Sequence, residues 1–155
     1  MMFPLPTTAR LLLILLFFDS SYSYAACPKK FSGEILIVGW KEEEPKEITL
    51  ERHKENSNFK KPEEVLSSNF QTKKSTNATG RSFLNISFKN HMFLPLGFDY
   101  RLKLNNKMEF LITEITPTGV GAWGCPLKSF KVNNCPTTFD RAITLDSACG
   151  KKIEN

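Results

Sequence analysis

The segment Phe98-Asp99-Tyr100-Arg101-Leu102-Lys103-Leu104 alternates apolar and charged residues at every step. Successive side chains of a β-strand point to opposite faces, so the two sets would lie on opposite sides of one strand. The aromatic and leucine side chains would face a hydrophobic core, and the charged side chains would face solvent. The segment therefore predicts a half-buried strand of a β-sheet protein.

Further short strands are expected on both sides of this segment. Apolar or alternating runs lie at residues 34–40, 47–51, 81–88, 108–115, 129–132 and 139–145. Turn-forming residues separate the runs, among them Asn105-Asn106. Residues 62–66 begin with proline and are expected to form a helical turn. About seven short strands joined by turns predict an all-β fold, an antiparallel β-sandwich.

The start of the chain has the composition of a secretory signal peptide. Arg10 supplies a positive charge, and the residues at 11–18 are all apolar. Ser23 and Ala25 then supply the small residues that signal peptidase requires, so cleavage after Ala25 is expected.

This reading divides the chain into a signal peptide at residues 1–25 and a single secreted domain at residues 26–155. A membrane anchor is the alternative, but a span needs about 20 apolar residues, and this run ends before Asp19. A lipoprotein signal is a poorer alternative, because Cys27 lies far from the apolar run. No integral membrane segment is predicted.

Four cysteines, Cys27, Cys125, Cys135 and Cys149, lie in the predicted domain. An even count in an oxidising compartment predicts two disulfides, for which three pairings are possible. We expect Cys27–Cys149 to join the two ends of the sandwich and Cys125–Cys135 to close a local loop. The main competing pairing is Cys27–Cys125 with Cys135–Cys149.

Catalytic and metal-binding patterns are missing from the sequence. It contains no CxxC, GxSxG, HExxH or phosphate-binding glycine loop. Its two histidines are His53, in a run of charged residues typical of a solvated surface, and His91, beside an apolar segment. We therefore predict that the protein is not an enzyme and uses no metal or cofactor.

Two sequons favour glycosylation in the same compartment. Asn77 and Asn85 each begin an Asn-X-Ser/Thr triplet, and an N-linked glycan requires an exposed asparagine.

The net charge of +5 is concentrated in lysine doublets, at Lys29-Lys30, Lys60-Lys61, Lys73-Lys74 and Lys151-Lys152. Outside the cell, such clusters meet anionic lipid headgroups or sulfated glycans rather than nucleic acid. The alternative is that the lysines only solvate loops. We select Lys60, Lys61, Lys73 and Lys74 as candidate contacts to an anionic surface.

Two apolar segments are candidate recognition surfaces. Residues 92–98 include Phe93 and Leu94, and residues 119–125 place Trp123 in a glycine-rich stretch. Exposed apolar patches mark protein or membrane contacts, and Trp is favoured at binding hot spots. The alternative is that all three side chains fill the core.

The order of these elements resembles the nematode transthyretin-like family of secreted proteins. The matching pieces are residues 31–36, Pro45 with 48–50, 62–66, 76–83, 97–104, and Thr138-Phe139-Asp140 with Leu145. The resemblance implies a transthyretin-like sandwich, related in class to the immunoglobulin-like sandwich, and a non-enzymatic extracellular role. Ile37 replaces a cysteine of that family, and Asn105-Asn106 replaces its histidine-to-cysteine stretch, so no cysteine pairing or site residue is carried over.

Together these features predict a secreted, non-catalytic binding protein, either a ligand carrier or a bridging adaptor. Its partner would be an extracellular protein, a lipid or an anionic surface. The alternative is a secreted effector or inhibitor that acts on a host or partner protein. An apolar cavity would favour ligand carriage, and an exposed apolar patch beside lysine doublets would favour bridging.

Overall fold

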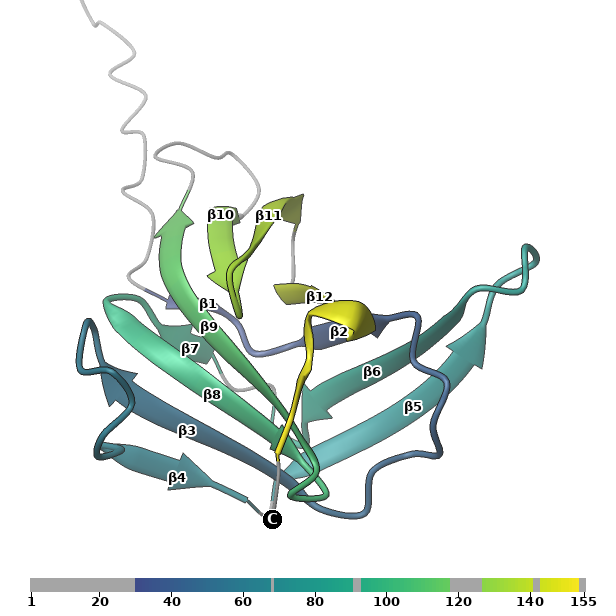
Figure 1. The fold of residues 1–155 in the computed structure, drawn as a ribbon, viewed down its shortest axis with the longest axis horizontal. Coiled ribbons are helices and arrows are strands. Elements are labelled where there is room, and N and C mark those ends of the chain that lie inside the picture. The colour runs from purple at the N-terminus through teal and green to yellow at the C-terminus, as the bar shows by residue number, and fades with distance from the viewer. Residues whose placement is uncertain (1–29, 68, 91–92, 118–126, 141–142, 154–155) are drawn as a thin grey trace, which may run out of the picture.

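The computed structural model describes residues 30–67, 69–90, 93–117, 127–140 and 143–153. Within these ranges nearly all regular structure is strand, which confirms the predicted all-β class (Figure 1). No helix in the described part of the chain is long and apolar enough to cross a membrane. The predictions for the signal peptide, Cys27, His91, Trp123 and Cys125 lie outside the described residues.

The described residues form thirteen strands and one short 3-10 turn. In chain order they are β1 (Lys30–Ser32), β2 (Ile35–Val38), β3 (Ile48–Lys54), β4 (Glu64–Leu66), β5 (Phe70–Thr76), β6 (Ser82–Phe88), β7 (Phe93–Pro95), β8 (Phe98–Leu104), β9 (Met108–Pro117), β10 (Leu127–Val132), β11 (Cys135–Asp140), β12 (Ile143–Asp146), η2 (Ser147–Cys149) and β13 (Lys151–Lys152). The count exceeds the expected seven for three reasons: β1, β4, β7 and β13 are too short to show a pattern, the polar seven-residue strand β5 was not expected, and one expected strand is divided between β11 and β12.

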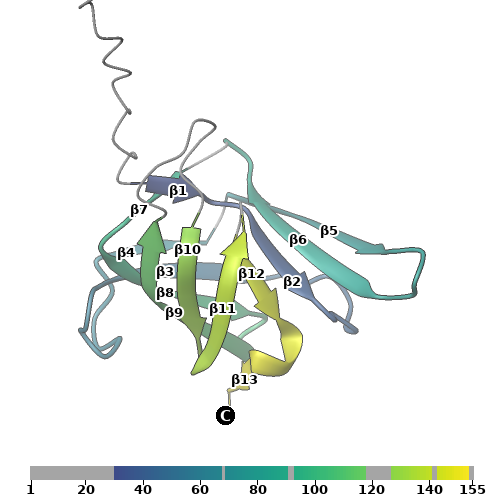
Figure 2. The same ribbon diagram turned by 90° about the horizontal axis from the view of Figure 1, so that it is seen from above.

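Two larger sheets enclose the core. The seven-stranded sheet has the order β11-β10-β9-β8-β3-β4, with β13 also paired to β9, and the four-stranded sheet has the order β12-β2-β6-β5. All pairs are antiparallel except β12 with β2. Figure 1 shows the sheets diverging from a common edge, and Figure 2 shows β11 and β12 side by side where one sheet gives way to the other.

The core lies between the inner faces of these sheets. In β8, Tyr100, Leu102 and Leu104 are buried, as the alternating pattern predicted. In the smaller sheet, Ile35 lies opposite both Ile86 and Ile143, and all three are fully buried. Side chains from distant parts of the sequence therefore share one apolar layer. Burial of their apolar surface is the main stabilising contribution in a domain of this kind.

The turn between β8 and β9 forms as expected. Asn105 and Asn106 adopt φ angles of 50° and 51°, the left-handed region that a tight hairpin requires and that asparagine tolerates well. The side-chain Oδ1 of Asn105 also accepts hydrogen bonds from the backbone N–H groups of Lys46 and Glu47. The turn thus connects the hairpin to the segment that leads into β3.

Two expectations about secondary structure are wrong. The helical turn predicted at residues 62–66 is the edge strand β4, because pairing with β3 sets Leu66 opposite Leu50 and against the core. The single strand predicted at residues 139–145 is replaced by the end of β11 and by β12, which belong to different sheets.

The disulfide pairing that we expected first is also wrong. Cys135, the first residue of β11, is bonded to Cys149 in the 3-10 turn, and their Cα atoms are 6.2 Å apart. A bridge to the start of the chain was favoured because Cys149 follows the last long strand. In the fold, Cys149 instead returns beside the β10–β11 turn, where the side chain of Asn133 donates to its carbonyl oxygen.

Candidate functional site

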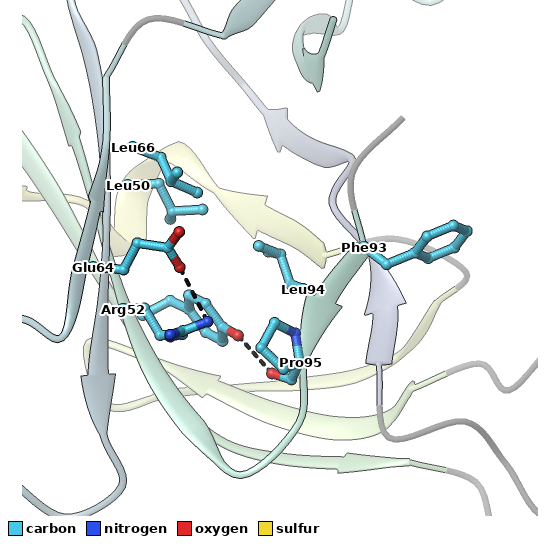
Figure 3. Close-up of a pocket in the computed structure, with 8 residues that line it drawn as sticks. Leu50, Arg52, Glu64, Leu66, Phe93, Leu94 and Pro95 are labelled. Atoms are coloured by element: carbon cyan, nitrogen blue, oxygen red, sulfur yellow. Dashed lines mark hydrogen bonds and ion pairs between the residues drawn. The ribbon is translucent and has the colours of Figure 1, made fainter. Parts of the chain in front are cut away.

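A pocket opens at one edge of the sandwich, between the β3–β4 pair and β7 (Figure 3). We call it the β4–β7 pocket. Its volume is about 190 Å³, and its lining comes from β3, β4, β7 and β8. The lining residues are Leu50, Arg52, Glu64, Leu66, Phe93, Leu94, Pro95 and Tyr100.

The apolar wall of the pocket is continuous with the core. Leu50 and Leu94 are almost fully buried, and Leu66 is partly buried against them. Tyr100 donates a hydrogen bond from its hydroxyl to the carbonyl oxygen of Pro95, at 2.5 Å, and so ties β8 to β7. Burial raises the pKa of the Tyr100 phenol far above its usual value, which keeps the hydroxyl a neutral donor.

The polar side of the pocket is an ion pair between neighbouring strands. Arg52 and Glu64 are register partners in the β3–β4 pair, and Nη1 of Arg52 lies 3.0 Å from Oε2 of Glu64. The guanidinium also lies over the ring of Phe98, 4.7 Å from its centroid. The side chain of Arg52 is 27% exposed and that of Glu64 is 43% exposed, so the pair stands at the mouth of the pocket.

Arg52 has unused hydrogen-bonding capacity. Its Nε is buried and has no hydrogen-bond partner among the described residues. A guanidinium carries five N–H donors, and buried donors in proteins are normally paired. The pocket therefore combines an apolar wall with a cation that can donate to a further hydrogen-bond acceptor.

The structure separates the two residues predicted from the 92–98 segment. Leu94 points into the pocket, whereas Phe93 is 61% exposed at the rim and its ring points away (Figure 3). Alternation along β7 explains the difference, because adjacent strand residues face opposite sides. The segment contributes one core residue and one exposed aromatic ring.

The predicted lysine contacts are not gathered at this pocket. Lys60 and Lys61 are exposed in the loop between β3 and β4, and Lys73 is exposed on β5 of the other sheet. Lys74 donates its Nζ to the carbonyl oxygens of Lys41 and Glu42, at 3.4 and 2.6 Å. Lys74 thus helps to hold the loop that precedes β3.

A second polar cluster lies on the outer face of the larger sheet. Glu51 accepts from Nε2 of His53 at 3.0 Å, from Arg101 at 3.2 Å and from Lys103 at 2.6 Å. Although burial alone would raise the pKa of Glu51, hydrogen bonds from Lys103 and His53 lower it overall. These contacts saturate the carboxylate, so the cluster serves to hold strands β3 and β8 together.

His53 corrects another expectation. It lies in a charged run, yet its side chain is fully buried. Phe59 from the β3–β4 loop packs edge-on against it, with the two ring centroids 4.9 Å apart. Nearby, Asp99 accepts from the backbone N–H of Asn56 at 3.0 Å, and burial raises the pKa of its carboxyl. Among the residues that the structure describes, no group of three or more His, Cys, Asp or Glu side chains is arranged to hold a metal ion.

Sequence reasoning missed the polar residues of the β4–β7 pocket. One signal was present: Ile48, Leu50 and Arg52 occupy alternate positions, so Arg52 continues the apolar face of the strand predicted at residues 47–51. The position of Glu64 could not be found in this way, because the sequence at residues 62–66 predicts a helical turn and not a strand.

Comparisons with protein-family models, curated proteins and solved structures found no match to this chain. The resemblance to the transthyretin-like family therefore stays a prediction, and the pocket has to be interpreted from its own chemistry.

Proposed function

We propose that this protein is secreted and acts outside the cell as a non-catalytic carrier of a small ligand, which it holds in the β4–β7 pocket. The observation that carries the proposal is the combination of a leucine wall with one guanidinium in a concave site at a sheet edge. Binding sites for small molecules are mostly apolar, with a few placed polar groups that orient the ligand.

Strands from the sandwich support most of this wall. Leu50 and Tyr100 lie on the paired strands β3 and β8, whose side chains continue into the core. Sites on rigid elements hold their shape better than sites on loops, so the ligand would meet a largely preformed surface.

The lining chemistry supports binding rather than catalysis. The one hydroxyl in the lining belongs to Tyr100, and it already donates to Pro95. Nucleophilic catalysis requires a nucleophile beside a base that activates it, and the described lining holds no histidine, cysteine or lysine. The extracellular setting is supported by the predicted signal peptide and by the Cys135–Cys149 disulfide, a bond typical of oxidising compartments.

The test is ligand recovery from the secreted protein. Wild-type protein would be incubated with extracellular fluid and repurified, and its small molecules would be extracted and identified by mass spectrometry. Leu66→Phe enlarges a lining side chain and should abolish recovery of the ligand. Leu36→Phe is the matched control, because Leu36 lies on the outer face of β2, away from the pocket.

The proposal predicts a compound that co-purifies with wild type and Leu36→Phe but not with Leu66→Phe. Equal recovery from all three proteins would show that the pocket does not carry it. Recovery of a tightly bound protein in place of a small molecule would favour the effector or inhibitor role. N-terminal sequencing of the same secreted material should begin at Ala26.

A further inference from the structure

We propose that the ligand of the β4–β7 pocket is a small molecule with an apolar body of about one ring and a carboxylate, which binds Arg52 in place of Glu64. This inference rests on the proposed function, since it names the ligand class of the same site.

The charge at the pocket favours an anion. Arg52 is the one cation among the eight described lining residues, and its planar guanidinium matches the geometry of a carboxylate. Phe98 lies beneath the guanidinium and limits where it can move. A ligand carboxylate would therefore meet a cation that is already oriented, with donors beyond the one that Glu64 engages.

Glu64 acts as an internal competitor. Its carboxylate occupies Nη1 of Arg52 at 3.0 Å, but its side chain is 43% exposed on the edge strand β4. Exposed ion pairs contribute about 0–1 kcal/mol, so little is lost when Glu64 turns into solvent. The ligand carboxylate can then take its place, while the ligand's apolar part is buried against the leucine wall, a gain that a carboxylate side chain does not provide.

The size of the pocket sets the size of the buried part. A cavity of about 150 Å³ lined by apolar side chains holds one benzene molecule, and this pocket has about 190 Å³. One six-membered ring or a short alkyl chain therefore fits between Leu50, Leu66 and Leu94. A longer ligand would leave the pocket past the exposed rim residue Phe93.

The test compares three probes that differ in one functional group: 3-phenylpropionate, its neutral amide, and 3-phenylpropylamine. Each would be titrated into the secreted protein by calorimetry and by NMR. The carboxylate should bind most tightly and the amine most weakly. The binding of the carboxylate should also weaken as salt concentration rises, because the mouth of the pocket is open to solvent.

Two substitutions of Arg52 test whether its guanidinium binds the ligand carboxylate. Arg52→Gln should weaken carboxylate binding about tenfold or more, because a hydrogen bond to a charged group contributes about 1.5–3 kcal/mol. The matched control is Arg81→Gln, which removes an exposed arginine at the β5–β6 hairpin. Arg52→Lys keeps the charge and should bind at an intermediate level, which covers the case in which Arg52→Gln fails to fold.

Glu64→Gln should strengthen carboxylate binding by about two- to fivefold, because it removes the competing anion. Its control is the adjacent Glu63→Gln, which should change nothing. If the amide binds wild type as tightly as the carboxylate, pocket binding stands and the anionic ligand class is wrong. If none of the probes binds, but Leu66→Phe still abolishes recovery of a natural compound, the carrier function stands and this inference is wrong.

Discussion

Glu51 and His53 lie two residues apart on β3, so their side chains share the outer face of the larger sheet, where Nε2 of His53 lies 3.0 Å from Oε2 of Glu51. Both side chains are buried there, although this face points away from the core. The ring of Phe59 packs against that of His53, and Arg101 and Lys103 of β8 pair with Glu51 to complete the cluster. A polar network of this kind stabilises a fold only while its charges remain paired.

We expect Glu51→Gln to lower the free energy of unfolding at pH 7 by about 1–3 kcal/mol, because it leaves the surrounding donors with a weaker acceptor. Urea denaturation would measure the loss. Glu42→Gln, at an exposed position before β3, is the control and should stay within about 0.5 kcal/mol of wild type. An equal effect of the two substitutions would show that the cluster contributes nothing specific.

The same cluster should make stability depend on pH in the acid range. The folded-state pKa of Glu51 is lowered from its ordinary value of 4.5. The group therefore stabilises the fold above that value, and the contribution is lost as the pH falls through the lower folded-state pKa. The difference between wild type and Glu51→Gln should accordingly shrink below pH 4.5. A difference that stays constant from pH 7 to pH 3 would contradict this assignment.

Asp99 should show the opposite dependence. Burial raises the folded-state pKa of Asp99 above its ordinary value of 3.8, so its ionised form opposes folding. The resulting loss of stability begins as the pH rises above 3.8 and is complete once the pH exceeds the raised folded-state pKa. Asp99→Asn should thus raise the free energy of unfolding at pH 7, and the gain should disappear below pH 3.8. Thermal unfolding at the two pH values checks the sign. Destabilisation at pH 7 would mean that the hydrogen bond from Asn56 outweighs the burial of charge.

The Cys135–Cys149 disulfide closes a loop with a sequence separation of 14 residues. In the chain-entropy model a loop of this length contributes about 3 kcal/mol, so the double substitution Cys135→Ser and Cys149→Ser should lower stability by about that amount. Peptide mapping of the unreduced protein should recover a peptide that joins these two cysteines. A cross-linked peptide that joins Cys149 to Cys27 instead would contradict the pairing.

Asn77 is the stronger of the two predicted glycosylation sites. It is exposed at the tip of the β5–β6 hairpin, and its Oδ1 accepts from the backbone N–H groups of Thr79 and Arg81. Protein secreted from eukaryotic cells should shift in electrophoretic mobility after endoglycosidase treatment, and Asn77→Gln should reduce the shift. Thr79→Ser keeps the sequon and should keep the shift. If the shift after endoglycosidase treatment is the same for Asn77→Gln as for wild type, the modified residue is Asn85, which is exposed on β6.

Local patterns in the sequence were sufficient to predict the strand class and much of the core. The alternation at residues 98–104 and the asparagine pair that follows depend on side-chain period and backbone preference, which act between near neighbours. Both are present in the structure as β8 and its turn. The apolar runs at residues 34–40 and 81–88 likewise became β2 and β6, the centre of the smaller sheet.

Tertiary structure alone decided which distant residues meet. Arg52 and Glu64 face each other because an edge strand pairs with β3, and a three-residue strand has too little pattern to be distinguished from a turn. His53 is buried because a loop folds back over it, and Cys149 reaches Cys135 because β12 joins the other sheet before the chain returns. Such contacts depend on how the strands pair, so the pocket appeared only in the folded protein, and only the fold decided that Cys149 pairs with Cys135 and not with Cys27.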